Sequence, residues 1–358
     1  MAKQKIVGIS FDHMHMGDLL RLAHAHPDAE VAGIFDPNPT KMATTIKTFN
    51  ISPDRVFTDF DACMTNAKPD LAILCAAPAD HATYTERLAK YGVHVFVEKP
   101  FAASAADARH MIAAMKPTGK MLAINWPLAW VESHIKAKHL IEQGVIGDLI
   151  EVHFYNGNRG PLFHLADKVE VSVKEVERLK PNSWWYKRAA GGGSLLDYMG
   201  YGATLGTWYM RGEAPIEVTC VVDETPDIEV DQHSITVCRY ARGLSKIETR
   251  WGTLTDPWII QNQPTCGFVF VGTEGTISSP DYASHVTVQT RAKPEPTLVP
   301  VEKLPAGRRN AIEYVLGCIK NGEPISGPLD PELSLTGQRI VDTAAQSARE
   351  KRTLALLP

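Results

Sequence analysis

The first third of the chain alternates short, continuous apolar runs with segments whose apolar residues share one helical face. The apolar runs span residues 5–9, 30–35, 56–57, 71–75, 93–97 and 121–124. Continuous apolar strands separated by amphipathic helices are typical of a parallel sheet that is covered on both faces. The pattern therefore predicts an N-terminal doubly wound Rossmann domain, of the dinucleotide-binding type, over residues 1–124.

The pattern changes after Asn125, where longer strands with an antiparallel character follow one amphipathic helix that ends at Gly144. We expect strands at residues 149–155, 217–222, 234–240, 245–251, 267–271 and 285–290, and two helices at the end of the chain. Residues 291–300 carry Lys and Pro and are expected to form an exposed loop. The predicted fold class is α/β, in which the Rossmann domain is followed by an α+β domain with a large, mostly antiparallel open sheet over residues 125–358.

Composition narrows the class of protein. A length of 358 residues corresponds to about two domains. The formal charge of −4 argues against a nucleic-acid or membrane-surface partner that depends on positive charge. The six cysteines form no C-x-x-C pair, and no apolar stretch approaches the ~20 residues that span a bilayer. We therefore expect a cytoplasmic enzyme with reduced thiols, and no nucleic-acid or membrane partner.

The loop after the first strand is the expected phosphate site of such a sheet, but it is poor in glycine. It reads from Ser10 to Gly17, and only Gly17 stands at a plausible glycine position. Asp12 in this loop opposes a phosphate unless its side chain turns away or caps the helix.

Asp36 follows the second strand, 19 residues after Gly17, close to the spacing of a carboxylate that binds the adenosine ribose hydroxyls. A carboxylate there favours NAD over NADP. The alternative is that Asp36-Pro37 only opens a turn.

Two further motifs carry candidate chemistry. Glu98-Lys99-Pro100 follows the fifth strand, where side chains point into the nicotinamide crevice, although a Lys-Glu pair is also common on surfaces. Lysine is a poor base at neutral pH unless its surroundings lower its pKa. The second motif is a triple glycine, residues 191–193, ahead of a helix on which Asp197 and Tyr201 share a face. These two side chains form either a proton-handling pair or a helix-start residue and a core residue.

Taken together, the motifs resemble the Gfo/Idh/MocA family, named for glucose–fructose oxidoreductase, inositol dehydrogenase and a rhizopine-catabolism protein. The resemblance rests on Glu98-Lys99-Pro100 after Ala76-Ala-Pro-x-x-His81, on Gly-Gly-Gly-x-Leu-Leu-Asp197 and on residues 270–276. It implies an NAD(P)-dependent enzyme that transfers hydride between nicotinamide and a hydroxyl or carbonyl carbon of a small, carbohydrate-like substrate. It also implies a homodimer or homotetramer formed through the second-domain sheet.

The resemblance also assigns residue roles. Lys99 is implied to transfer the proton, assisted by Asp197 and by Tyr201, which stands where the family usually has histidine. The phenol needs its pKa lowered by a neighbour such as Lys99 to act as a base. The residues expected at the cofactor are Ser10, Phe11, Asp12, His13, Asp36, Ala77, Pro78, His81, Glu98, Lys99, Trp126 and Trp185. The residues expected at the substrate are Lys99, Asn125, His153, Arg159, Asp197 and Tyr201.

Three alternatives stay open. Asp12, His13 and His15 form a possible metal cluster, but three ligands within four residues of one loop are awkward, so we predict no metal site. A redox-assisted glycosidase or lyase that recycles NAD in the site fits the same motifs. So does a non-catalytic sugar- or dinucleotide-binding protein, because the loop lacks its glycines.

Overall fold

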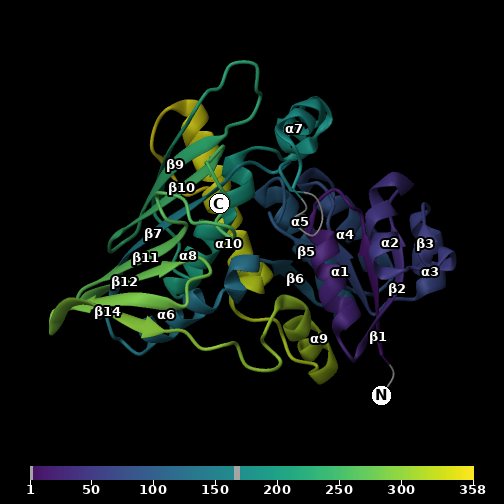
Figure 1. Cartoon of the computed structure of the whole chain (residues 1–358), viewed down its shortest axis with the longest axis horizontal. Helices are drawn as coiled ribbons and strands as arrows, with labels where there is room; N and C mark the ends of the chain where they lie inside the picture. The colour runs from purple at the N-terminus through teal and green to yellow at the C-terminus, as the bar shows by residue number, and fades with distance from the viewer. Residues whose placement is uncertain (1–2, 165–169) are drawn as a thin grey trace.

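The computed structural model describes residues 3–164 and 170–358, which form two sheets with helices packed against them (Figure 1). The first sheet has six strands in the order β3-β2-β1-β4-β5-β6, and all of its pairs are parallel. Its strands are β1 (Gln4–Ile9), β2 (Ala29–Phe35), β3 (Val56–Phe57), β4 (Leu71–Leu74), β5 (His94–Glu98) and β6 (Leu122–Asn125). This order and direction confirm the predicted doubly wound Rossmann sheet.

The helices between these strands begin where the sequence supplies caps and bury one apolar face. Ser104 caps α5 by accepting a hydrogen bond from the Asp107 N–H at 3.1 Å, and Asp59 caps α3 in the same way at Ala62. The five helices are α1 (His15–Ala25), α2 (Ala43–Phe49), α3 (Phe60–Ala67), α4 (His81–Lys90) and α5 (Ala105–Met115). They cover the sheet and leave the carboxyl ends of its strands uncovered.

The second sheet has nine strands in the order β14-β13-β12-β11-β7-β10-β9-β8-β15. Only β7 and β10 pair in parallel, so the sheet is mostly antiparallel, as predicted. Its strands are β7 (Leu149–Asn158), β8 (Glu217–Val222), β9 (His233–Arg239), β10 (Leu244–Trp251), β11 (Gly267–Gly272), β12 (Gly275–Pro280), β13 (His285–Thr290), β14 (Lys293–Pro300) and β15 (Leu354–Ala355).

The expectation that residues 291–300 form a loop is wrong, because β14 occupies this segment and pairs with β13. Pro294 and Pro296 have no backbone N–H group to donate, so the sequence of this segment resembles that of a loop. The strand lies at the edge of the sheet, where one row of N–H groups needs no partner and proline is tolerated.

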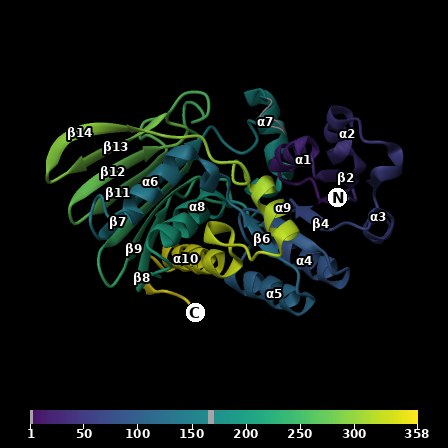
Figure 2. The same ribbon diagram turned by 90° about the horizontal axis from the view of Figure 1, so that it is seen from below.

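Helices cover one face of this second sheet and connect it to the first (Figure 2). The helix α8 packs on β7 and β10, α10 packs on α8 and α5, and α9 contacts α1. The helices outside the Rossmann sheet are α6 (Glu132–Glu142), α7 (Val173–Leu179), α8 (Ser194–Tyr209), α9 (Ala311–Asn321) and α10 (Pro331–Glu350). The division at residues 124 and 125 stays a prediction. None of the helices in the described ranges has the length and apolar character needed to cross a membrane.

Candidate active site

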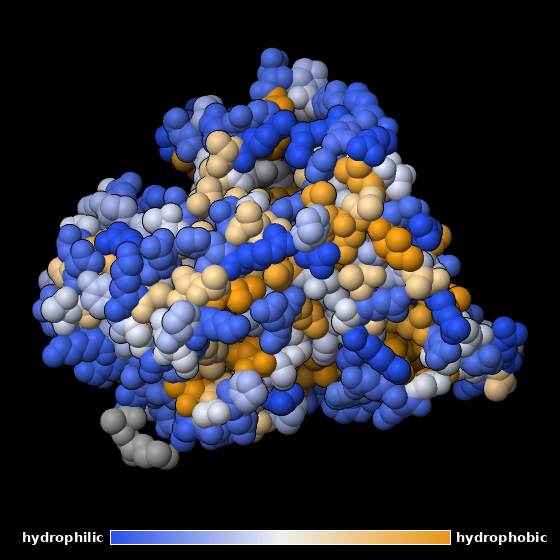
Figure 3. Space-filling view, turned by 180° about the vertical axis from the view of Figure 1, so that it is seen from behind, coloured by the Kyte–Doolittle hydropathy of each residue, from blue (hydrophilic) through white to orange (hydrophobic). Residues whose placement is uncertain are grey.

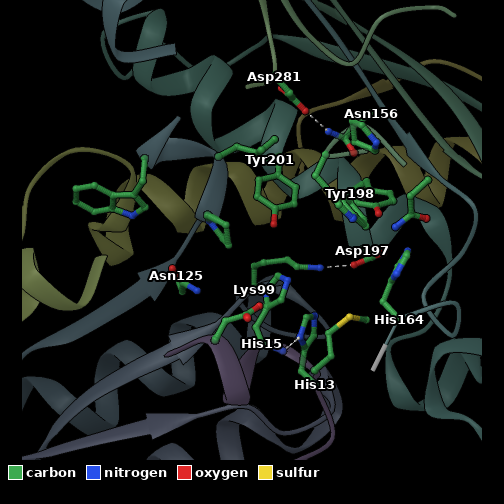
Figure 4. A pocket seen from close by; sticks show the side chains of 18 of the residues that line it. His13, His15, Lys99, Asn125, Asn156, His164, Asp197, Tyr198, Tyr201 and Asp281 are labelled. Atoms are coloured by element: carbon green, nitrogen blue, oxygen red, sulfur yellow. Dashed lines mark hydrogen bonds and ion pairs between the residues drawn. The ribbon is translucent and has the colours of Figure 1, made fainter. Parts of the chain in front are cut away.

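The carboxyl ends of the strands of the Rossmann sheet face a pocket of about 260 Å³, whose opposite wall comes from the second sheet and α8 (Figure 4). Lys99 follows β5 and Asn125 ends β6, and both line the pocket together with His13 and His15 from the loop after β1. Parallel sheets bind their ligands beyond the carboxyl ends of their strands, so this is the position expected of an active site.

Lys99 and Asp197 form an ion pair inside this pocket (Figure 4). Their side chains are only 4% and 5% exposed, and the Asp197 carboxylate also accepts a hydrogen bond from Trp251 Nε1 at 3.1 Å. The Lys99 ammonium lies 5.5 Å from the Trp185 ring centre and 5.7 Å from that of Tyr201. The sequence prediction that these side chains share one site agrees with this geometry, and the Lys99–Pro100 peptide is cis.

Tyr201 lies one turn beyond Asp197 on α8, with its ring 5.5 Å from Trp126. Burial raises the pKa of the Tyr201 phenol well above its usual value, and the carboxylates of Glu98 and Asp197 raise it further. The condition under which the phenol could act as a base, a pKa lowered by a neighbour such as Lys99, is therefore not met. Tyr201 is therefore a neutral hydrogen-bond donor near neutral pH rather than a base.

The triple glycine brings the chain before α8 against the Rossmann sheet. A Cβ atom on Gly191 would lie 2.8 Å from Pro78, and one on Gly192 would lie 2.2 Å from the Trp185 carbonyl oxygen. Gly191 also has a φ of +87°, which other residues rarely adopt. These close approaches explain why glycine is needed immediately before the helix that carries Asp197.

Asp36 ends β2 with a fully buried carboxylate. One of its oxygens accepts the Phe11 N–H at 2.7 Å and the other accepts the Asn38 N–H at 2.8 Å. Both carboxylate oxygens are therefore used in backbone hydrogen bonds, and the side chain is not exposed in this structure. Asp36 thus holds the loop after β1 and the turn after β2, and its contact with the adenosine ribose stays a prediction.

The loop after β1 reaches its turn without the usual glycines. Ser10 adopts the left-handed backbone conformation, with a φ of +62°. Asp12 does not cap α1. Its carboxylate accepts hydrogen bonds from Lys41 Nζ at 2.5 Å and from the Ala77 N–H at 3.2 Å. Since Lys41 balances its charge, Asp12 does not present an unpaired carboxylate to a phosphate, and the loop is compatible with NAD.

His13, His15 and Glu98 come together at the ends of β1 and β5, and the two histidines lie below the Lys99–Asp197 pair in Figure 4. Glu98 is fully buried, and its carboxylate contacts His15 Nδ1 at 2.8 Å and accepts a hydrogen bond from Asn125 Nδ2 at 2.7 Å. Burial lowers the pKa of His13 well below its usual value, and the nearby His15, Lys99 and His81 lower it further. His13 Nδ1 accepts the His15 N–H at 3.2 Å, which places the proton of the neutral ring on the buried, unpaired Nε2. That nitrogen is a donor in this arrangement, although the ligand atoms of His13, His15 and Glu98 lie within 4.8 Å of one another, close enough to share a metal ion.

Four residues expected at the site have other roles in the structure. Both ring nitrogens of His81 lie against backbone carbonyls, at 2.9 and 3.0 Å. Trp126 packs behind Tyr201, where its Nε1 donates to Ser334. His153 pairs with Glu151 on the sheet face that points away from the pocket, because strand residues alternate between faces. Arg159 binds Asp256 and Glu170, which fixes the loop beside the pocket.

Sequence reasoning missed several residues that line the second-domain wall. These are Asn156, Tyr198, Asp281 and Tyr282, which lie beside Asn158 and His164 in the same lining. Asn156 and Asn158 lie on the same face of β7 as the buried Val152 and Phe154. Polar residues at alternate positions that continue a row of buried side chains along a strand could have indicated this part of the pocket wall.

Comparison with known proteins places this geometry in a class. Residues 4–126 match the model of an oxidoreductase family with an NAD-binding Rossmann fold. Residues 134–278 match the GFO/IDH/MocA C-terminal domain, and the chain belongs to the Gfo/Idh/MocA family of oxidoreductases.

Individual relatives are distant. Inositol 2-dehydrogenase of Salmonella typhimurium is 25% identical over 182 residues, which cover 49% of this chain and 52% of that relative. The chain thus matches only about half the length of the first curated relatives. D-apiose dehydrogenase of Paraburkholderia graminis is 25% identical over 350 residues, covering 92% of this chain and 83% of that protein. The crystal structure of aldose-aldose oxidoreductase from Caulobacter crescentus has the same fold, with a TM-score of 0.79 and 23% identity over 99% of this chain and all of that one.

Proposed function

We propose that the protein is an NAD-dependent oxidoreductase that acts on a hydroxyl or carbonyl carbon of a sugar, a polyol or a related small molecule. The observation that carries the proposal is the buried ion pair of Lys99 and Asp197, which lines a pocket at the carboxyl edge of the Rossmann sheet. Ion pairs that serve only stability are uncommon at this depth, because desolvating both charges costs several kcal/mol. Family membership and the named relatives support the same activity.

Lys99 is proposed to hold the reacting oxygen of the substrate and to transfer its proton. Asp197 keeps the ammonium group in place, and Trp251 in turn holds Asp197. The Tyr201 hydroxyl, neutral near pH 7, donates a second hydrogen bond to the same oxygen. Two donors directed at one oxygen stabilise the negative charge that develops there during hydride transfer.

Nicotinamide, when bound, supplies the acceptor or donor of the hydride. We propose that Asp36 binds the adenosine ribose and that its negative charge disfavours the 2′-phosphate of NADP. We propose that Ser10, Phe11, His13 and Pro78 contact the rest of the dinucleotide. Trp185 and the backbone of Ala77 are proposed to enclose its nicotinamide end.

The pocket wall supports a hydroxyl-rich substrate. Amide and carboxylate groups of Asn156, Asn158 and Asp281 alternate with the aromatic surfaces of Tyr198 and Trp258, a combination that suits the polar and apolar faces of a sugar ring. The test is a screen of aldoses, inositols and anhydrosugars with NAD and NADP, in which NADH absorbance and sugar consumption are followed together. NADH that accumulates with an oxidised sugar supports the proposal, whereas sugar consumed without net NADH indicates recycling of the cofactor in the site.

We also propose a homodimer or homotetramer that forms through the uncovered face of the second sheet. Val237 and Val269 flank Lys246 and His153 in one row across four strands of this face. Both valines are exposed, as are Val221, Ile235 and Leu298. Hydrophobic side chains break the polar surface on the half of the molecule that holds this sheet (Figure 3). An apolar face of this kind is typical of a subunit interface.

A further inference from the structure

His15 is a partly exposed imidazole of the pocket, and its orientation is fixed by a carboxylate that is itself fixed. Its Nδ1 lies 2.8 Å from Glu98 Oε1, and Glu98 Oε2 accepts a hydrogen bond from Asn125. Glu98 is fully buried, so its carboxylate cannot turn to water. A carboxylate accepts hydrogen bonds, so Nδ1 carries the proton and the lone pair of the neutral ring is on Nε2.

The Nε2 atom of His15 is available to a ligand. The side chain is 22% exposed and lines the same pocket as Lys99, and Nε2 has no hydrogen-bond partner among the residues that the structure describes. Its neighbour His13, with a ring centre 4.4 Å away, has a pKa well below its usual value and stays neutral. A proton on His15 is therefore not opposed by a second imidazolium.

The proton chemistry of the site leaves a role for such a group. Lys99 Nζ donates to Asp197, and the Tyr201 phenol keeps its proton near neutral pH because its pKa is raised, so both side chains present hydrogen-bond donors. Oxidation of an alcohol needs an acceptor for the hydroxyl proton.

We propose that His15, oriented by Glu98, is the proton acceptor of this site, supplied by the loop after β1 rather than by α8. This inference rests on the proposed oxidoreductase function. In the oxidative direction, bound NAD⁺ would supply the acceptor for the hydride, while Lys99 takes the hydroxyl proton and gives one of its own protons to His15 Nε2. The products are a carbonyl compound, NADH and one proton, which the imidazolium releases to water. In reduction the same proton moves in the opposite direction.

The pH dependence of this step reflects more than one group. The titratable and charged side chains that face His15 or line the same pocket are His13, Asp18, Glu98, Lys99, His164, Asp197, Tyr198, Tyr201, Asp281 and Tyr282. A variant that removes titration at His15 alone is therefore needed to assign it. His15→Gln keeps a polar side chain of similar size and cannot accept the proton.

The test compares the pH profile of kcat/KM for NAD reduction in the wild type, His15→Gln and His110→Gln. His110 lies beside Glu86 on the surface of the Rossmann domain and serves as the matched imidazole–carboxylate control. We expect His15→Gln to lower kcat by about 10²-fold or more, within the usual range for acid–base groups, and to change the shape of the pH profile of kcat/KM. We also expect added imidazole to restore part of the activity of His15→Ala, and NADH affinity, measured by fluorescence, to change less than threefold.

An unchanged pH profile in His15→Gln overturns the inference. So does a stoichiometric divalent metal in the purified wild type that is absent from His15→Gln, because His13, His15 and Glu98 then hold a cation. If none of the sugars tested supports NAD reduction by the wild type, the proposed function fails. The arrangement of His15 is then judged separately, by ¹⁵N NMR of the imidazoles. We expect the spectrum to show that neutral His15 carries its proton on Nδ1, and that this preference is lost in Glu98→Gln. A wild-type spectrum with the proton on Nε2 would contradict the arrangement.

Discussion

Lys99 and Asp197 are 98 positions apart in the sequence and form a buried ion pair that joins the end of β5 to the first turn of α8. The first comes from the nucleotide-binding sheet and the second from the helix that packs on the other sheet. The pair therefore assembles only when both halves of the chain are folded and docked. Removing one partner leaves the other charge buried and unpaired, a change that costs about 3–5 kcal/mol in comparable pairs.

Asp36 is expected to determine the choice of cofactor. Replacing it with Asn removes the charge that repels a 2′-phosphate but keeps one carbonyl oxygen for the backbone donors. The ratio of NADPH to NADH affinity should rise by about tenfold or more, corresponding to ~1.4 kcal/mol. Fluorescence titration measures this ratio, and Asp70→Asn is the control because Asp70 accepts a backbone hydrogen bond from Lys5 away from the crevice. An unaltered ratio in Asp36→Asn would show that another residue discriminates.

Tyr201→Phe tests the role of the phenol as a donor. Because the pKa of Tyr201 is raised, the phenol stays neutral throughout about pH 6–9 and loses no proton there. The variant should lower kcat by about 10²-fold, as expected when one donor to a developing oxyanion is removed, and leave the shape of the pH profile unchanged. A basic limb that disappears in Tyr201→Phe would mean that the phenol ionises during turnover.

His13 should make the folded state sensitive to acid. Its pKa is lowered in the folded protein, so the unfolded chain binds the proton more readily. Stability is therefore complete above the unfolded pKa of about 6.5 and falls as the pH drops below it, with a loss of ~1 kcal/mol by pH 5.5 from this one histidine. Urea denaturation at pH 7.5, 6.5 and 5.5 measures the loss. We expect the loss of unfolding free energy to be smaller in His13→Gln than in the wild type. An equal loss in both proteins would count against a neutral, buried His13.

The uncovered face of the second sheet should control assembly. Val237→Glu combined with Val269→Glu places two charges on this face and should convert the wild-type oligomer to monomer, as measured by light scattering after size exclusion. Leu254→Glu is the matched control, since Leu254 is 99% exposed outside the strands. A wild-type monomer, or an oligomer that persists in the double variant, contradicts the proposed interface.

The sequence was sufficient for the Rossmann order and most of the second sheet, because both depend on local periodicity. It failed at β14, where the prolines of an edge strand resemble those of a loop. The site was only partly predictable. Lys99 and Asp197 belong to recognisable motifs, but the contact of Glu98 with His15 joins two strand ends, and no spacing in the chain encodes it. The roles of His153 and Trp126 could not be read either, since each depends on which face of an element is covered.

The most direct test of the central claim is the rate of NADH formation by the wild type and by Lys99→Met, with the sugar that the screen identifies. NADH binding is measured in parallel by fluorescence, and thermal melting confirms that the variant is folded. The account predicts that Lys99→Met binds NADH with nearly wild-type affinity but forms NADH about 10²–10⁴-fold more slowly. Wild-type kinetics in a folded Lys99→Met protein would contradict it.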